Sequence, residues 1–512
     1  MKKIISSFLT LAVATMLFAE DSYTVKTFRQ KIIPANPTGT GVQIDFPFLG
    51  YSDTSKDPVL FNELVDAIKK MGIKTLRFPG GCAAYAYSFH RPEPFSAFKP
   101  VYYACDEKIG QWSDVDNFLR LCKAAGCQAL YQLNIGNYYD PESKMVYAIA
   151  PRDSGLRYGA PKEQQKMKLD TPKSANYDYS KLSTAADEAG QIARKAQKAG
   201  VKVIWEFGNE DYCFYSPETY IKTVKPFYQA IRAVDPKAEF AICGDGISWG
   251  DWRWSQEVLK LAAENKLPVD YASFHIYVSG GGGGKYTDGT ASYDGIIKSY
   301  KNIRHLHAGM RKHLDSLGYN NTKLAITEGN VSSGKPMLGQ PFEHGMGRAL
   351  GEAAIYPDRI RRYAMLIHHD LVRSGPQNGT WYCRIFYEPA NKPGERYILP
   401  TAATVMGKMT GHASRMIIFD SLTGVAVSQG ENDFLFTAGN PTGSAKDVSF
   451  KIDFPLTAPQ ELVTNIICAE NMDTPNFKAL NGKAFISKAD KDQRMIKITL
   501  PPYSFTYLTV KK

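Results

Sequence analysis

Two glutamates each follow a short apolar segment of the chain. Glu210 closes the motif Trp-Glu-Phe-Gly-Asn-Glu at 205–210, which begins after the apolar residues 201–204. Glu328 directly follows a second apolar segment, 324–327. Two carboxylates at the C-terminal ends of strands are typical of retaining glycoside hydrolysis. In that chemistry one carboxyl group donates a proton and the other is the nucleophile, ~5–5.5 Å apart across the sugar.

These two glutamates are 118 residues apart in the chain (328 − 210), so a fold must bring distant strand ends together. A (β/α)₈ barrel gathers them at its C-terminal face. Between about 40 and 410, short apolar strands alternate with amphipathic helices, which is the pattern of a parallel α/β fold. The strands are expected at 41–46, 73–78, 128–135, 201–207, 240–244, 269–278 and 324–327, with the eighth at 380–387.

Alternation along these strands predicts which side chains face the barrel axis. The expected inward sets are Thr75 with Arg77; Gln132 with Asn134; Glu206, Gly208 and Glu210; Ser273, His275 and Tyr277; and Leu324, Ile326 and Glu328. Polar groups therefore collect at inward positions near the C-terminal strand ends. This distribution predicts a functional site rather than a purely apolar core.

From about 413 the pattern changes to short alternating segments punctuated by Asn, Gly, Asp and Pro. Eight such segments predict a β-sandwich. They are expected at 416–419, 424–428, 434–438, 448–454, 461–467, 484–487, 495–500 and 505–510. The predicted organisation is a signal peptide at 1–19, N-terminal strands that join the sandwich at 20–40, the barrel at 41–412 and the sandwich at 413–512.

The N-terminal residues predict export. Lys2 and Lys3 precede an apolar stretch, 4–18, which ends in Ala19 before two acidic residues. This order is typical of a secretory signal, and a membrane anchor is the weaker alternative because the apolar stretch is short and lacks a basic stop. The sequence therefore predicts a secreted or periplasmic protein with no membrane span after signal removal.

The formal net charge of the chain is +11. A basic surface can favour anionic partners such as uronate-bearing or sulfated polysaccharides, or it can simply keep the protein soluble. No Lys/Arg cluster of the nucleic-acid-binding kind stands out in the sequence, so we expect no nucleic-acid partner. The sequence leaves the oligomeric state open.

The eight cysteines, at 82, 105, 122, 127, 213, 243, 383 and 468, could pair in many ways. Cys82–Cys105 is the first disulfide to test. Cys122 and Cys127 lack a second CxxC or a His pair, so we expect no zinc site. The glycine run 280–284 has no phosphate-binding motif around it. We expect neither a metal nor a cofactor.

Four motifs resemble those of the clan A glycoside hydrolases. They are Leu-Arg-Phe-Pro-Gly-Gly at 76–81, Leu-Asn-Ile-Gly at 133–136, Trp-Glu-Phe-Gly-Asn-Glu at 205–210 and Ile-Thr-Glu at 326–328. In spacing and domain order the chain is most similar to family 51, which holds α-L-arabinofuranosidases and some endoglucanases. It is also similar to families 39, 44 and 79. The resemblance spans about residues 40–410 and includes the sandwich that follows.

The resemblance implies roles for particular residues. Glu210 would be the general acid/base and Glu328 the nucleophile, which must keep different pKa values. Three residues would support the nucleophile: Arg77, His275 and Tyr277. Asn209 would bind the substrate 2-hydroxyl, and Asn134 would line the same subsite. The sequence departs from family 51 after Glu328, where Gly329 and Asn330 stand in place of the usual Trp.

Other residues carry two interpretations. Glu206 is expected to be a buried, paired framework residue rather than a third catalytic group. Trp249 and Trp252 could stack on sugar rings or pack under a loop. The residues 368–370 (His-His-Asp) are expected to lie in a helix without metal spacing. Residues 137–180, rich in tyrosine, are expected to form an ordered wall of the site, and 280–284 a mobile lid.

The leading functional hypothesis is a retaining glycosidase of the α-L-arabinofuranosidase type that acts on plant or algal polysaccharide. One alternative is an endo-acting glucanase, or an enzyme directed at uronate or sulfated polysaccharide. A second is a catalytically inactive glycan-binding barrel, and a third is a transglycosylase or an unrelated barrel enzyme.

Overall fold

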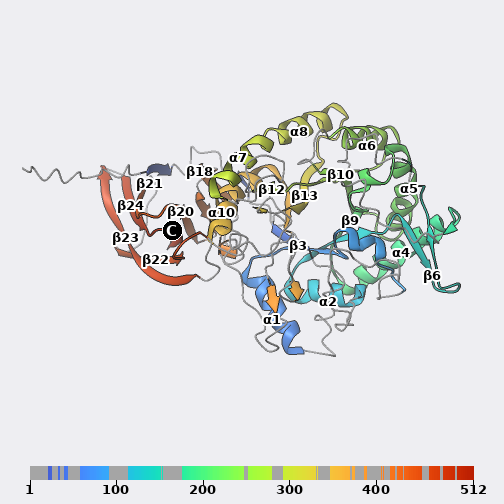
Figure 1. Ribbon diagram of the computed structural model, residues 1–512, viewed down its shortest axis with the longest axis horizontal. Helices are drawn as coiled ribbons and strands as arrows, with labels where there is room; N and C mark the ends of the chain where they lie inside the picture. Colours follow the sequence, from blue (N-terminus) through green and yellow to red (C-terminus); the bar gives the residue numbers. More distant parts are fainter. Residues whose placement is uncertain are drawn as a thin grey trace, which may run out of the picture.

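The computed structural model describes a (β/α)₈ barrel followed by a curved antiparallel sheet (Figure 1). The described residues are 21–25, 33–34, 40–43, 58–90, 114–151, 153, 176–246, 252–279, 292–329, 331–332, 346–368, 372–374, 386–388, 405, 407–408, 415–420, 422, 424–430, 432–452, 461–472, 477–490 and 493–511. Cys105, Cys383, Trp249 and the glycine run 280–284 lie outside them, as does the side chain of Cys82. The predicted Cys82–Cys105 pair and the predicted lid therefore stay predictions.

Eight parallel strands close the barrel, as the sequence predicted. In order around it they are β3 (Thr40–Gln43), β4 (Thr75–Phe78), β5 (Gln128–Leu133), β9 (Val203–Phe207), β10 (Glu239–Gly246), β11 (Tyr271–His275), β13 (Lys323–Gly329) and β15 (Met365–His368). The first seven overlap the expected segments. Leu366 of β15 pairs with Thr40 of β3, which completes the ring.

The predicted eighth strand was wrong. Residues 386–388 form β17 (Phe386–Glu388), which pairs with β16 (Val372–Ser374) in a separate two-stranded sheet. The eighth barrel strand is instead the four-residue β15, and its last residue is His368, which the sequence placed in a helix. Four residues are too few to show the alternation of apolar and polar positions that marks a strand. In the sequence such a short apolar run looks the same as the end of a helix.

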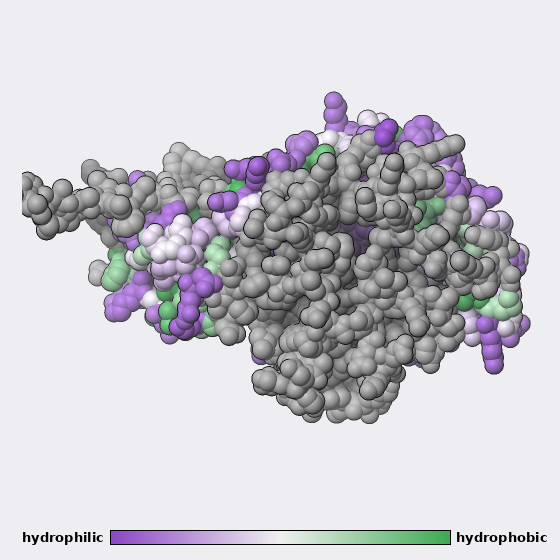
Figure 2. Space-filling view, viewed as in Figure 1, coloured by the Kyte–Doolittle hydropathy of each residue, from purple (hydrophilic) through white to green (hydrophobic). Residues whose placement is uncertain are grey.

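Helices cover the outside of the barrel. They are α1 (Pro58–Lys70), α2 (Val115–Ala125), α4 (Lys181–Ala199), α5 (Pro217–Val234), α6 (Arg253–Glu264), α7 (Tyr293–Ile303), α8 (Leu306–Ser316) and α10 (Met346–Arg362), with 3₁₀ turns η2 (Gly81–Ala86) and η4 (Asp211–Cys213). Local sequence sets their ends: Asp114 caps α2 by accepting from the Asn117 amide, and Gly126 ends it with φ 70°. Figure 2 shows hydrophilic side chains along the edge where α6, α7 and α8 lie.

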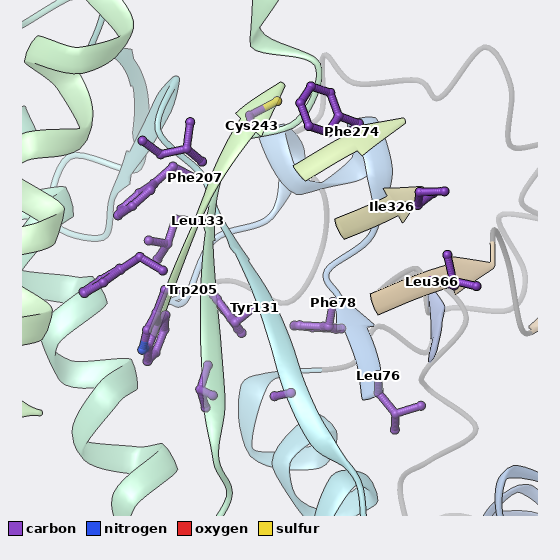
Figure 3. Close-up of a cluster of buried hydrophobic side chains, with 14 of the residues drawn as sticks. Leu76, Phe78, Tyr131, Leu133, Trp205, Phe207, Cys243, Phe274, Ile326 and Leu366 are labelled. Atoms are coloured by element: carbon purple, nitrogen blue, oxygen red, sulfur yellow. The ribbon is translucent and has the colours of Figure 1, made fainter. Parts of the chain in front are cut away.

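Two apolar layers hold the barrel. One layer lies inside the barrel and consists of apolar side chains that point inward from the strands. They are Leu130, Ile204, Ala241, Tyr271, Ala325, Met365 and Ile367. Between strands and helices lies a larger cluster, and Figure 3 shows members such as Leu76, Trp205 and Ile326 on the outer side of the strands. The inward positions predicted for Leu324 and Ile326 were therefore wrong, because Ala325 faces the interior while these two residues face the helices.

The second unit contains the eight predicted strands. They are β18 (Arg415–Asp420), β19 (Val425–Gln429), β20 (Asp433–Asn440), β21 (Lys446–Ile452), β22 (Glu461–Cys468), β23 (Lys478–Asp490), β24 (Gln493–Leu500) and β25 (Ser504–Lys511). With β1 (Asp21–Val25) and β2 (Ile33–Pro34) at its two edges, they form one ten-stranded sheet. Phe436 of β20 contacts Phe450 of β21 at 5.0 Å between ring centroids, although the two strands are not neighbours in the sheet. The sheet therefore folds over on itself as a sandwich.

Helix α10 lies between the barrel and the sandwich (Figure 1). On its sandwich side, Ala353 packs near Gly424, and the Gly347 amide donates to the carbonyl of Met472 at 2.8 Å. On its barrel side it contacts β15 and α7. Every residue of α10 from 346 to 360 is buried. This helix thus joins the two units.

Two further small sheets extend the C-terminal rim of the barrel. β6 (Asn137–Asp140), β7 (Met145–Ala148) and β8 (Asn176–Tyr177) form one after β5. β12 (Val278–Ser279) and β14 (Val331–Ser332) form the other, as parallel continuations of β11 and β13. Among the described residues, no helix combines the length and apolar character that crossing a membrane requires.

A glycine of β10 that packs against β11 gives a test of this packing. A Cβ on Gly244 would lie 2.4 Å from the carbonyl oxygen of Ser273, so Gly244→Ala must push two barrel strands apart. We expect a loss of about 1–3 kcal/mol in the free energy of unfolding, measured by denaturant titration. The matched control is Gly190→Ala in α4, where the nearest atom is 3.4 Å away and alanine favours the helix. Equal stability of the two variants would contradict the packing.

Candidate active site

A buried arginine organises the C-terminal end of the barrel. Arg77, the third residue of β4, has no exposed surface. Its Nε donates to Glu206 at 2.7 Å, its Nη1 to Glu328 at 3.0 Å and its Nη2 to the side-chain oxygen of Asn209 at 3.0 Å. One guanidinium thus bonds to residues of β9, of the segment after β9 and of β13. Glu206 is the paired framework residue that the sequence predicted.

Glu328 reaches this site through an irregularity in β13. Phe274 of β11 pairs with Ile326, but the next residue, His275, pairs with Glu328. Two residues of β13 thus oppose one of β11, as in a β-bulge, which re-aims the side chain that follows. The Glu328 carboxylate accepts from Arg77 at Oε2 and from the Tyr277 hydroxyl at Oε1, the latter at 2.5 Å.

Glu210 lies across from Glu328 and is held by fewer bonds. Its backbone is left-handed, with φ 52°, where β9 gives way to η4. Its Oε1 lies 2.9 Å from Nδ1 of His275, which is itself 3.8 Å from Oε2 of Glu328. The side chain of Glu210 is 17% exposed and that of Glu328 is 9% exposed. Glu210 is therefore the more accessible carboxyl group of the two.

The three side chains Glu210, His275 and Glu328 place one carboxylate or imidazole atom each within 4.8 Å of one another. Such a set can in principle hold a metal ion. Here both oxygens of Glu328 are already engaged, one of them by a buried guanidinium. A cation would compete with that guanidinium for the same carboxylate, so the donor set fits a carboxylate pair better than a metal site.

The charges in the site raise the pKa values of two basic side chains. Burial works against the charged form of Arg77, but the carboxylates of Glu206 and Glu328 outweigh it and raise the pKa of the guanidinium. Burial also disfavours the imidazolium of His275, while Glu328 and Glu210 raise its pKa above the usual value. Both effects follow from neighbouring negative charge in a buried place.

A family model described as cellulase (glycosyl hydrolase family 5) matches residues 38–340, more than half of the chain. The chain belongs to this family. The predicted membership of clan A is thereby confirmed, and the protein is a glycoside hydrolase. A comparison with curated protein sequences finds no match.

Solved structures resemble this glycoside hydrolase over almost its whole length. An alpha-L-arabinofuranosidase from Thermotoga maritima is 13% identical, with a TM-score of 0.64 over 96% of this chain and 99% of that one. A family 51 alpha-L-arabinofuranosidase from Bifidobacterium longum is 16% identical, with a TM-score of 0.62 over 96% and 99%. A bifunctional glucanase-xylanase from a metagenome library is 15% identical, with a TM-score of 0.60 over 96% and 98%. These likenesses show the fold that the sequence predicted.

Asn209 of the glycosidase sits in a cradle that the sequence did not predict. Gln132 donates to its side-chain oxygen at 3.0 Å, alongside Arg77. The hydroxyl of Tyr85 accepts from the backbone amide of Asn209 at 3.1 Å and donates to the buried carboxylate of Asp211. Alternation along its strand places Gln132 inward, so the sequence could have pointed to this residue. Tyr85 and Asp211 lie in turns, whose geometry no periodic pattern reveals.

Asn134, a predicted substrate ligand, makes other contacts in the structure. Its side-chain amide donates to the carbonyls of Tyr85 and Tyr87, and its oxygen accepts from the backbone of Gly136 and Asn137. All its hydrogen-bonding capacity thus goes to loops of the rim.

Trp252, a second predicted ligand, lies at the start of α6. Its ring contacts His313 of α8 edge-to-face, at 5.5 Å between centroids. The ring thus packs against α8 at the start of α6, and a role of Trp252 in sugar binding stays a prediction. Stacking of Trp249 on a sugar stays a prediction, because that residue lies outside the described part of the chain.

The predicted tyrosine wall is in part a packed rim. Tyr138 of β6 is buried and lines a cavity of about 40 Å³ that also contacts β5 and α4. Glu188 of α4 lines the same cavity, and burial raises its pKa to about 8. Tyr138 thus faces a helix and not the carboxylate pair. Residues 154–175 of the predicted wall lie outside the described part of the chain.

Asp211 gives the site a testable pH dependence. Burial, together with the charge of Glu206, raises its pKa to about 8, although the Tyr85 hydroxyl opposes the shift. Between about pH 4 and pH 8 the folded protein therefore keeps the Asp211 proton that the unfolded chain has lost. The free energy of unfolding falls as pH rises through this range. We expect the Tm of Asp211→Asn to fall less than that of the wild type across this range in differential scanning calorimetry.

The control for this measurement is Asp153→Asn. Hydrogen bonds from Thr219 and Ser216 outweigh burial and lower the pKa of Asp153, so its contribution is lost only in acid. A Tm profile of Asp211→Asn that is parallel to the wild type between about pH 4 and pH 8 would contradict the raised pKa of Asp211.

Proposed function

We propose that this glycoside hydrolase acts by a retaining double displacement and releases α-L-arabinofuranosyl residues from plant or algal polysaccharide. The observation that carries the mechanism is the separation of the two carboxylates. One oxygen of Glu210 and one of Glu328 lie within 4.8 Å of each other. Retention needs carboxyl groups ~5–5.5 Å apart, while inversion leaves ~6.5–9.5 Å for a water molecule.

In the proposed first step, Glu328 attacks the anomeric carbon while Glu210 protonates the leaving oxygen. The environment of each group supports its role. Glu328 accepts a bond from Arg77 and another from Tyr277, which favour its ionised form. Glu210 is more exposed and bonds to His275, with which it can exchange a proton. In the second step Glu210 removes a proton from water, which releases the sugar from Glu328.

The proposed sugar rests on the fold. Alpha-L-arabinofuranosidases share both the barrel and the sandwich of this chain. A second candidate is an endo-acting glucanase, which the cellulase family model and the bifunctional glucanase-xylanase favour. The predicted export signal fits either activity, because both substrates are extracellular polymers, and we propose a secreted or periplasmic location.

A panel of substrates separates the two candidates. Purified protein is assayed on aryl α-L-arabinofuranoside, aryl β-glucoside, arabinan and mixed-linkage glucan, and the anomer of the first product is read by NMR. We expect release of arabinose with retained configuration. Inverted product would overturn the mechanism, and activity confined to internal bonds of glucan would favour the second candidate.

Variants of the carboxylates test the division of roles. Glu328→Gln is expected to abolish turnover of every substrate while leaving binding intact. Glu210→Gln is expected to lose ~10²–10⁴-fold on natural glycosides but far less in the first step on aryl glycosides, whose leaving groups need little protonation. Added azide should then restore turnover of Glu210→Gln, since an anionic nucleophile needs no base.

Glu188→Gln is the matched control, because this glutamate is partly buried, as Glu210 is, but lies on α4, outside the carboxylate pair. It should keep wild-type kcat. Identical behaviour of Glu210→Gln and Glu328→Gln on aryl glycosides, with or without azide, would refute the assignment.

A further inference from the structure

The proposed nucleophile and the tyrosine that bonds to it are both attached to a small buried sheet outside the barrel. Tyr277 directly precedes β12, and Glu328 lies three positions before β14. Val278 and Val331, paired between these two strands, have no exposed surface and pack with side chains of α7 and α10. The position of the Tyr277 hydroxyl relative to Glu328 therefore depends on how this sheet is fixed.

Two charged side chains of α10 bond to the backbone at the start of that sheet, one within β14 and one just before β12. Glu352 accepts the amide of Val331 at Oε1, at 3.0 Å. Arg359 donates from Nη2 to the carbonyl of Ile276 at 3.3 Å. Glu352 is 1% exposed and Arg359 is 2% exposed. Burying a charged side chain is costly, so a helix would not keep two of them inside without specific bonds.

Arg359 bonds to the backbone between two residues of the site. Ile276 lies between His275 and Tyr277, and its amide donates to the carbonyl of Glu328 at 2.9 Å. The fit there is tight, because a Cβ on Gly329 would lie 2.5 Å from the same Ile276 carbonyl. A shift of Ile276 would thus move the tyrosine hydroxyl and the glutamate together or break the 2.5 Å bond between them.

We propose that Arg359 and Glu352 are positioning residues for the nucleophile of this enzyme. Arg359 fixes the segment that carries His275 and Tyr277, and Glu352 fixes the segment that follows Glu328. Neither touches the carboxylate pair, and both act through the backbone. This inference rests on the proposed function, since it assigns Glu328 as the nucleophile. It explains why the inner face of α10 carries charge where an ordinary core helix is apolar.

The test is a double-mutant cycle between Arg359→Met and Tyr277→Phe, followed on an aryl glycoside that the wild type cleaves. Misplacing a reacting group by about 1 Å can cost ~10²-fold in rate, so Arg359→Met should lower kcat by about tenfold or more with KM within about twofold. In the Tyr277→Phe background, the same change should cost much less, because the hydroxyl that Arg359 positions is already gone.

Controls on the same helix separate positioning from folding. Arg361→Met removes a cation that pairs with Asp358 and is 38% exposed, and it should leave kcat unchanged. Glu352→Gln keeps an oxygen that can accept the Val331 amide and should stay near wild type in kcat, whereas Glu352→Leu should lose activity as Arg359→Met does. If Arg359→Met does not fold, Arg359→Lys takes its place in the cycle.

The outcomes are distinct. Strictly additive effects of Arg359 and Tyr277 on kcat, or a change in KM alone, would overturn the positioning role while the wild type remains an active glycosidase. A wild-type protein that is inactive on every glycoside would instead overturn the proposed function, and this inference with it. Non-additive loss in kcat, with Arg361→Met unaffected, would support both.

Discussion

The buried guanidinium of Arg77 is the interaction on which the C-terminal half of the barrel depends. An unpaired charge at this depth would cost several kcal/mol, and the bonds to Glu206, Glu328 and Asn209 offset that cost. Removal of any one partner leaves the cation less well compensated. The geometry of the site is therefore also a condition of the barrel's stability. Below this polar layer, the seven apolar side chains of the interior supply ordinary packing.

The sandwich has a structural role that follows from α10. A helix that is buried on every side over fifteen residues cannot be covered by the barrel alone, and here the sandwich strands β18, β20 and β25 cover its other face. Since α10 also bonds to the segments after β11 and β13, the sandwich supports the strand ends that carry the site. This arrangement gives a physical reason for a sandwich directly after the barrel in one chain.

Sequence reasoning reached the site where residue type and strand position agree. Arg77, His275 and Tyr277 interrupt apolar runs at strand ends, so simple alternation places them inward. It failed where the backbone departs from regularity. The irregular pairing of β13 reverses the expected parity of Ala325 and Ile326 while still delivering Glu328 to the site. The short β15 carries too few residues for any period, so the longer segment 380–387 matched a strand pattern better.

Residue type alone does not show which polar side chains also bond to the local backbone. Asn134 has the chemistry of a sugar ligand, but four backbone groups of the rim occupy its amide. Conversely, Glu352 and Arg359 resemble the solvent face of a helix, because charged residues rarely lie inside. That they are buried follows only from the packing of α10 between the barrel and the sandwich, which the sequence pattern does not reveal.

The proposed roles of the two glutamates rest on an asymmetry in their surroundings. Both oxygens of Glu328 accept bonds, from a guanidinium and from a phenol, so its charge is satisfied without water. Glu210 has one bond to His275 and keeps nearly a fifth of its side-chain surface exposed. A nucleophile needs a fixed, ionised carboxylate, whereas an acid/base must gain and lose a proton in each turnover. Exchange of the two roles would require Glu328 to take up a proton against Arg77, so the surroundings favour Glu328 as the nucleophile and Glu210 as the acid/base.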